Sequence, residues 1–171
     1  MSDFFQNGVI TTLHNLKTRS LEDLEAELIR LSRERPMALV LPSLFSELQR
    51  PALERIVDEL TKVPYLSQIV IGLDRADEEQ YRYAVRYFGR LPQHHRILWN
   101  DGPRLRAVDA RLEALGLAPQ EAGKGRNVWY CFGYLQASGI AQAVALHDCD
   151  ILTYERGMLA RLLYPVVNPL L

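Results

Sequence analysis

The sequence has few of the features that mark specialised classes of protein. Two of its 171 residues are cysteines, Cys131 and Cys149, too few for a disulfide scaffold, and we expect buried, reduced thiols. Basic and acidic residues nearly balance, 20 against 21, so no whole-chain field favours nucleic acid or an anionic membrane. No apolar run approaches the roughly 20 residues of a membrane span. With no signal pattern in MSDFFQNGVI, these absences predict a globular, cytoplasmic protein.

Two common nucleotide-binding motifs are also absent. No GxGxxG follows the first predicted strand, which disfavours a dinucleotide fold of the usual kind. The GKGRN segment (123–127) is not a Walker A loop, because six residues separate Gly116 from Gly123 and Gly125 stands where Ser or Thr is required. It does place Lys124 between two glycines at the start of a predicted helix, where backbone amides favour anions. We expect Lys124 to meet a phosphate or pyrophosphate; the alternative is a flexible basic loop.

Short apolar runs alternate along the chain with apolar residues at helical spacing. The runs predict buried strands at 37–41, 68–73, 96–99 and 143–147. The helical patterns predict helices at 20–35, 51–60, 77–88, 103–115, about 126–138 and from Thr153 onward. Nearly continuous apolar strands between amphipathic helices indicate an α/β fold, a doubly wound, mostly parallel sheet with helices on both faces.

Two of the predicted helices carry apolar groups at helical spacing, and the second of these groups is expected to lie in the core. The helix at 103–115 carries a stripe at helical spacing, formed by Leu105, Val108, Leu112 and Leu115. The helix at 126–138 carries an aromatic group, formed by Trp129, Tyr130, Phe132 and Tyr134. Such a group is more often core than a platform on which bases stack.

The predicted topology places three polar loops at one crevice. Four strands joined by right-handed crossovers commonly take the order 3-2-1-4. Ligands of doubly wound sheets bind beyond the carboxyl ends of the strands, where the strand order reverses. The loops that meet there are LPSLFSEL after the first strand and HDCDIL after the fourth, with GLDRAD after the second strand next to them.

Asp148 and Asp150 are separated by one residue at the end of the fourth strand. In extended backbone such side chains point to the same side, and carboxylate oxygens at that spacing suit Mg²⁺ or Mn²⁺. The alternative is a solvated strand end. A zinc site on His147 and Cys149 is a further alternative, but it lacks the paired spacing of zinc ligands.

Taken in order, VLPSL after the first strand, GKG before the fourth and DCD at its end resemble the nucleotide-sugar half of a GT-A glycosyltransferase. The resemblance is to the glucosyl-3-phosphoglycerate synthase and mannosylglycerate synthase group, and it covers roughly residues 36–165. It implies a nucleotide-sugar-binding α/β domain at 36–171 that stops before the acceptor-binding part. Residues 1–35 would then form an N-terminal helical extension.

The resemblance also implies roles for single residues in donor binding. A uridine pocket would be lined by Pro42, Ser43 and Leu44. The base or ribose would be reached by Glu47, and Asp74 would stand beside the uracil. The family usually has two acids at the fourth and fifth positions after the proline, whereas here the fourth position is Ser46.

The diphosphate and its metal are assigned in the same way. Lys124 would meet the pyrophosphate, Asp148 would lie near the ribose, and Asp150 would hold a divalent metal, Mg²⁺ or Mn²⁺, with Asp148 nearby as a second acid. The metal and Lys124 would stabilise the charge that develops on the leaving nucleoside diphosphate. Asp150 and Lys124 are therefore the candidate catalytic residues.

The implied reaction moves a hexose, glucose or mannose, from a UDP- or GDP-hexose donor to a small anionic acceptor such as 3-phosphoglycerate or glycerate. One alternative is a non-catalytic nucleotide-sugar-binding fragment, which could form a homodimer through an exposed apolar face. The other is a phosphotransferase of the haloacid dehalogenase kind. That motif requires Thr or Val four residues after its first aspartate, where this chain has Leu152.

Overall fold

The computed structural model describes residues 19–170. The strands are β1 (Met37–Leu44), β2 (Leu66–Asp74), β3 (His95–Trp99) and β4 (Ala143–Leu146). The helices are α1 (Leu21–Leu31), the 3₁₀ helix η2 (Phe45–Gln49), α2 (Pro51–Leu60), α3 (Glu78–Phe88), α4 (Pro103–Ala114), α5 (Lys124–Ser138) and α6 (Arg156–Val167). All four predicted strands are present. The last helix begins at Arg156 rather than Thr153, after a turn.

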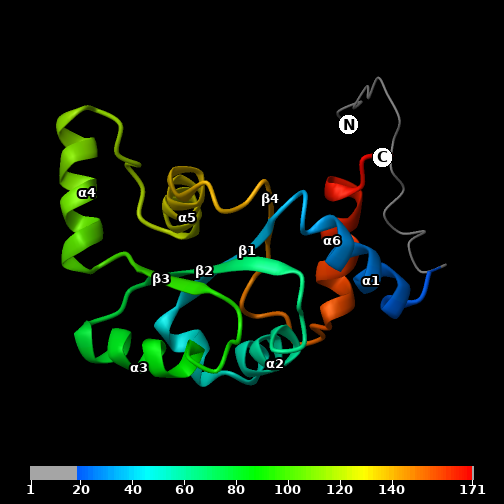
Figure 1. The fold of residues 1–171 in the computed structure, drawn as a ribbon. Helices are drawn as coiled ribbons and strands as arrows, with labels where there is room; N and C mark the ends of the chain where they lie inside the picture. The colour runs from blue at the N-terminus through cyan, green and yellow to red at the C-terminus, as the bar shows by residue number, and fades with distance from the viewer. Residues whose placement is uncertain (1–18, 171) are drawn as a thin grey trace, which may run out of the picture.

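The four strands form one parallel sheet in the order β3-β2-β1-β4, as predicted (Figure 1). The strand order reverses between β1 and β4, so the connections after these two strands leave in opposite directions. In register, Leu44 at the end of β1 lies opposite Asp74 at the end of β2. The α/β fold class is therefore confirmed, and the sheet brings the loops after β1, β2 and β4 to one edge.

The two faces of the sheet carry side chains of different size. On β1, Met37, Leu39 and Leu41 point into a large core formed with α1, α2, α3 and α6, which we call the four-helix face. Ala38 and Val40 point the other way, into a small cluster with α5, which we call the α5 face. Figure 1 shows α5 on the opposite side of the sheet from α2 and α3.

Gly72 allows α5 to approach the sheet closely. A Cβ atom at this position would lie 1.9 Å from the side-chain oxygen of Asn127 and 2.7 Å from the sulfur of Cys131. The Asn127 amide instead donates a 2.8 Å hydrogen bond to the Gly72 carbonyl. A glycine inside a strand often marks such an approach of another element. This contact fixes the first turn of α5 to the end of β2.

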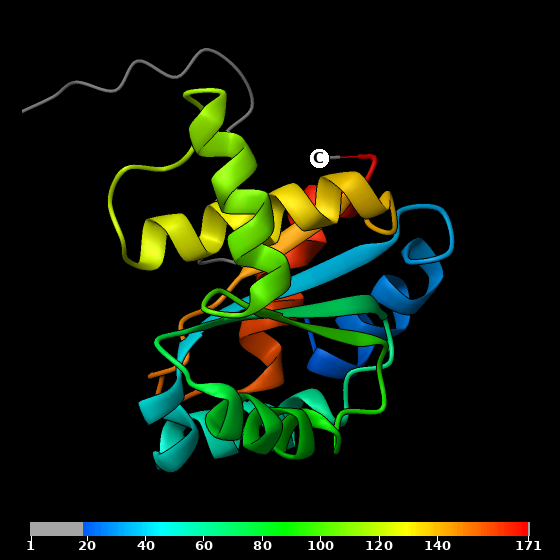
Figure 2. The same cartoon turned by 90° about the vertical axis from the view of Figure 1, so that its left-hand side faces the viewer.

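The two apolar groups on the predicted helices differ in how far they are buried. None of the α4 residues is buried, and within the predicted stripe Val108 is 47% and Leu115 71% exposed. The reason is that α4 stands away from the sheet, as Figure 2 shows. On α5 only Tyr130 of the predicted aromatic group is buried, whereas Trp129 and Phe132 are exposed. The predicted aromatic core group is therefore confirmed for Tyr130, in part for Tyr134, which packs against the small cluster, and is wrong for Trp129 and Phe132.

Helix α1 is the first element of the described residues and packs into the core. Ser20 caps α1 by accepting a hydrogen bond from the Asp23 amide, as its sequence pattern suggests. Leu24 and Leu28 are fully buried in the same core as the strands. Residues 1–18 of the predicted extension at 1–35 lie outside the described residues. Among residues 19–170, no helix is both long and apolar enough to cross a membrane.

Candidate functional site

A cleft of about 180 Å³ lies beyond the carboxyl ends of β1 and β2, beside the start of α5. This is the place that the predicted topology indicates for a ligand. Six of the residues assigned to the donor by resemblance line the cleft. The complete lining is Pro42, Ser43, Leu44, Glu47, Asp74, Arg75, Gly123, Lys124 and Asn127.

The β1 wall of the cleft is held in place by its own hydrogen bonds. The Leu44 amide donates to a Glu47 carboxylate oxygen at 2.8 Å, which fixes the start of η2. The hydroxyl of Ser43 is 1% exposed and donates to the Leu44 carbonyl at 3.0 Å. Glu47 therefore has a structural role in the first turn, and its second oxygen remains for a ligand.

Asp74 forms the β2 wall of the cleft and is almost fully buried, at 4% exposure. The side-chain amide of Asn100, which follows β3, donates to it at 3.2 Å. A buried carboxylate needs such partners, because removing it from water is costly. Asn100 therefore holds Asp74 in a fixed position at the edge of the cleft.

Lys124 is the first residue of α5, two residues earlier than the predicted helix start near Arg126. Gly123 precedes it with φ of 152°, a conformation that favours glycine. The Lys124 ammonium forms a hydrogen-bonded ion pair with Asp148, and the two side chains are 57% and 45% exposed. Ion pairs this exposed contribute only about 0–1 kcal/mol, so an incoming ligand or cation can separate the partners at little cost.

The two aspartates differ from the predicted arrangement. Strand β4 ends at Leu146, and the backbone at Cys149 and Asp150 forms a turn, so the prediction of an extended Asp-Cys-Asp segment was wrong. Asp148 is bound by Lys124, and Asp150 is exposed. Within residues 19–170, no group of three or more His, Cys, Asp or Glu side chains could hold a metal ion.

His147 and Cys149 are both buried, and neither lines the cleft. His147 is 7% exposed and its Nδ1 atom lies 3.1 Å from the Tyr154 hydroxyl. Burial lowers the pKa of His147, against the opposing effect of the Asp148 charge. Burial raises the pKa of the Cys149 thiol and raises that of Cys131 to about 12. Both cysteines are free and buried, as predicted, and the zinc alternative has no ligand cluster in the described residues.

Two residues of the cleft were not foreseen as site residues. Asn127 is 3% exposed and ties α5 to Gly72, and the glycine within the QIVIGL strand was the signal for this contact. Arg75 has φ of 55°, which is uncommon for a residue with a side chain. The adjacent Ala76 holds that turn, because its amide donates to Asp101 and its carbonyl accepts from the Trp99 indole.

Two curated proteins are similar to the chain along nearly all of its length. The glucosyl-3-phosphoglycerate synthase of Persephonella marina is 48% identical over 171 residues, 100% of this chain and 42% of that protein. The glucosyl-3-phosphoglycerate synthase of Methanococcoides burtonii is 38% identical over 168 residues, 97% of this chain and 40% of that protein. The chain thus spans well under half of the length of either relative. No protein-family model matches it.

Solved structures of the Mycobacterium tuberculosis glucosyl-3-phosphoglycerate synthase share the fold. One is a complex with Mn²⁺, UDP and glucosyl-3-phosphoglycerate, with a TM-score of 0.55 and 17% identity over 84% of this chain and 44% of that one. Another, with Mn²⁺ and UDP-glucose, has the same TM-score and identity over 85% of this chain and 44% of that one. These structures confirm the likeness of fold.

Proposed function

We propose that this chain, which is related in sequence to the glucosyl-3-phosphoglycerate synthases along its whole length, is the donor-binding part of a glycosyltransferase. Its donor would be a UDP- or GDP-hexose, with glucose or mannose as the sugar. The acceptor would be a small anion such as 3-phosphoglycerate or glycerate. The observation that carries the proposal is the cleft at the strand ends, with Lys124 at its rim and Asp148 bound to that lysine.

The cleft offers different chemistry to the two ends of a nucleoside diphosphate. Pro42 and Leu44 give apolar surface for a base, and the fixed carboxylates of Glu47 and Asp74 can accept hydrogen bonds from the base or ribose. Lys124 and the amides of the first turn of α5 favour the diphosphate. A nucleoside diphosphate would therefore lie with its base near β1 and β2 and its phosphates toward α5.

The acids after β4 suit a hard divalent cation. Asp150 is exposed and Asp148 is half exposed, so both carboxylates can reach a ligand in solution. Mg²⁺ and Mn²⁺ are commonly held by one or two carboxylates together with waters and substrate phosphates, so a third protein ligand is not required. A bound metal would act as a Lewis acid that offsets the charge of the diphosphate.

Lys124 has two partners in this proposal. Without a ligand it neutralises Asp148, and with a diphosphate bound it moves to the phosphate oxygens. That exchange leaves the Asp148 carboxylate available beside Asp150 for a cation. Removing one electrostatic partner of a developing anion costs about 3 kcal/mol, or about a hundredfold in rate, by analogy with oxyanion donors.

The second candidate function is binding of a nucleotide sugar without transfer. The specific observation behind it is that, among residues 19–170, no group of three or more His, Cys, Asp or Glu side chains could hold a metal ion. Both candidates predict the same donor site, and they differ in whether the bound sugar is released. Loss of the sugar from a bound donor therefore separates them.

Calorimetric titration of UDP into the chain, with and without Mn²⁺, tests the donor site. We expect binding that requires Mn²⁺ and that is lost in Asp150→Ala. Lys124→Gln should weaken binding about tenfold, because one charge-assisted hydrogen bond to phosphate is lost. Asp58→Ala, which removes an exposed acid on α2 far from the cleft, is the matched control and should bind as the unchanged chain does.

Two outcomes would overturn the proposal. One is UDP binding of equal affinity in the presence of Mn²⁺ or of EDTA, and the other is full binding by Asp150→Ala. Incubation with UDP-glucose and Mn²⁺, followed by measurement of free glucose, then distinguishes a catalytic remnant from a binding fragment. Hydrolysis that stops in Lys124→Gln would support the transferase.

A further inference from the structure

A large cavity lies at the outer edge of the sheet, along β3. It has a volume of about 750 Å³ and lies between α3, β3 and α4, with Tyr134 of α5 at its border. Gly102 lies directly against the Trp99 ring at one end of the cavity, because a Cβ atom there would lie 2.5 Å from that ring. The absence of that atom lets α4 start directly against Trp99 and then rise away from the sheet (Figure 2).

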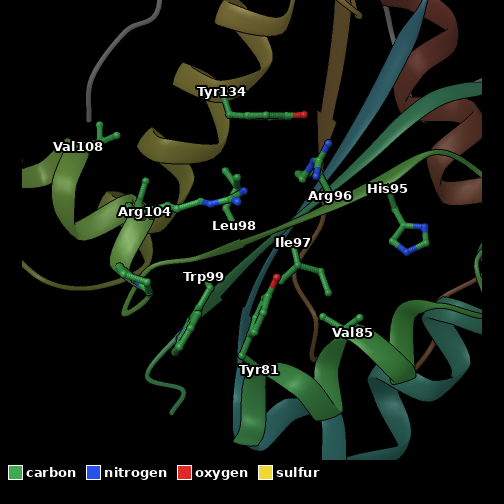
Figure 3. A pocket seen from close by; sticks show the side chains of 13 residues that line it. Tyr81, Val85, His95, Arg96, Ile97, Leu98, Trp99, Arg104, Val108 and Tyr134 are labelled. Carbon is green, nitrogen blue, oxygen red and sulfur yellow. The ribbon is translucent and has the colours of Figure 1, made fainter. Parts of the chain in front are cut away.

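The cavity extends over both sides of the edge strand β3, and its wall on the α3 side is aromatic and rigid, whereas Leu98 and Tyr134 line it on the α5 side (Figure 3). The rings of Tyr81 and Trp99 are stacked, with centroids 4.7 Å apart and planes 9° apart. The Trp99 indole donates a 2.7 Å hydrogen bond to the Ala76 carbonyl, which fixes its orientation. Val85 and Val108 line the same cavity and remain 44% and 47% exposed. A cavity of this size with a mostly apolar lining is typical of a small-molecule site.

The charged groups of the cavity are all basic. Arg96 of β3 and Arg104 of α4 line it together with His95, and no Asp or Glu is part of the lining. Neither arginine forms an ion pair or a side-chain hydrogen bond with any of residues 19–170. Figure 3 shows Arg104 reaching from α4 toward Leu98 and Arg96 on β3. Two guanidinium groups that share a cavity without an acid make it attractive to an anion.

A neutral donor stands beside the two arginines. The Tyr134 hydroxyl accepts a 3.2 Å hydrogen bond from the Gln68 amide, so its own proton is available to a ligand. Gln68 is fully buried, and its Oε1 atom has no partner among the described residues. A ligand that accepted the Tyr134 proton would give this hydroxyl a second hydrogen-bond partner.

We propose that this cavity is a second ligand site, which binds a small anion with a flat apolar body, such as an aryl phosphate. The anionic group would be held by Arg96 and Arg104, with Tyr134 as a further donor. The flat body would pack against the apolar side chains of Leu98 and Val108, which line the cavity on the same side of β3 as Tyr134 (Figure 3). The cavity shares no lining residue with the cleft at the strand ends, so the site is separate from the donor site and does not depend on it.

Titration with phenyl phosphate, followed by calorimetry, tests this site. We expect a Kd of about 1 mM, as befits a fragment-sized ligand, and binding about tenfold weaker for inorganic phosphate and for benzyl alcohol. Arg96→Gln and Arg104→Gln should each weaken phenyl phosphate binding about tenfold through loss of a charged hydrogen bond. Neither residue is buried, so both variants should fold.

Arg106→Gln is the matched control, because Arg106 lies on the same helix, lines no part of this cavity and pairs with Asp101. It should bind phenyl phosphate within about twofold of the unchanged chain. Val108→Glu adds an acid to the lining at an exposed position and should abolish binding. Binding that survives Val108→Glu, that Arg106→Gln weakens as much as Arg104→Gln does, or that UDP with Mn²⁺ displaces would overturn the proposal. Absence of phenyl phosphate binding at about 10 mM would overturn it as well.

Discussion

The two faces of the sheet contribute differently to the stability of the fold and to ligand binding. On the four-helix face the strands present large residues, among them Leu39 and Ile71, to a continuous core. On the α5 face they present smaller ones, Ala38, Val40 and Gly72, to a single helix. The small residues let α5 lie close to β2, and that closeness brings Lys124 to the strand ends.

The difference separates stability from ligand positioning. The four-helix face buries the larger apolar area and therefore contributes most of the hydrophobic free energy. The α5 face contributes less, but Lys124 and the first-turn amides that we assign to the diphosphate depend on where α5 begins. A substitution on the first face should act mainly on unfolding, and one on the second face should act mainly on binding.

The largest effect is expected from Leu39→Ala, at the centre of the four-helix face. Leu39 is fully buried, so the change leaves a cavity and should lower the free energy of unfolding by about 4 kcal/mol. Urea denaturation monitored by circular dichroism measures this. Leu98→Ala on the partly buried edge strand is the control, with an expected loss of about 1 kcal/mol. Equal losses in the two variants would contradict the contrast between the faces.

Gly72→Ala should give the next largest effect and should affect both properties. The added methyl group overlaps Asn127 and Cys131, so α5 must move away from β2 at a cost of about 2 kcal/mol. Because Lys124 moves with the helix, UDP affinity in the presence of Mn²⁺ should fall as well, by about tenfold. The control is Gly133→Ala, since a Cβ atom on Gly133 of α5 meets nothing within 4 Å. A stable Gly72→Ala variant with unchanged UDP affinity would disprove the positioning role.

The sequence predicted the strands, their order and the crevice because each depends on local patterns and on chirality. Continuous apolar runs gave the strands, and right-handed crossovers gave the 3-2-1-4 order that β3-β2-β1-β4 confirms. The cleft lined by Leu44, Asp74 and Lys124 follows from that order. These features need no knowledge of side-chain packing.

The predictions from sequence that were wrong concern features that depend on the distances between elements. The stripe on α4 has helical spacing, but spacing cannot show that the helix stands away from the sheet and leaves the stripe without a partner (Figure 1). The aromatic residues of α5 lie around several sides of the helix, and only the side that carries Tyr130, Cys131, Tyr134 and Leu135 meets other elements. Strand β4 also ends at Leu146, one residue earlier than the apolar run at 143–147 suggested, and a turn follows at Cys149 and Asp150. The alternation of large and small residues within the strands was the available signal that the α5 face would carry the smaller side chains.

A smaller effect is expected from pH, through His147. Burial lowers the pKa of this imidazole below its ordinary value of 6.5, so the unfolded chain takes up a proton that the folded chain does not. The contribution of neutral His147 to the free energy of unfolding is therefore complete above about pH 6.5. Below that pH the free energy of unfolding falls by at most about 1.4 kcal/mol per pH unit. Urea denaturation at pH 7.5 and 5.5 should show this loss in the unchanged chain and a smaller one in His147→Gln.

The choice of pH range separates this group from the carboxylates. Hydrogen bonds from Arg19 and Lys62 lower the pKa values of Glu27 and Glu59 below 4.5, so their contributions are lost only at more acid pH. A loss of stability between pH 7.5 and 5.5 therefore reports on groups that titrate near neutrality. The same loss in His147→Gln as in the unchanged chain would exclude His147 as its source.

The smallest effect is expected on α4, and it tests the comparison most directly. Leu115 of the α4 stripe and Leu24 of the α1 stripe look equivalent in sequence, but Leu115 is 71% exposed and Leu24 is fully buried. Leu115→Ala should therefore change the free energy of unfolding by less than about 0.5 kcal/mol, whereas Leu24→Ala should lower it by about 3 kcal/mol. Thermal and urea denaturation of both variants measure the difference. A large loss in Leu115→Ala would mean that α4 is packed in solution, and the cavity at β3 would then be closed.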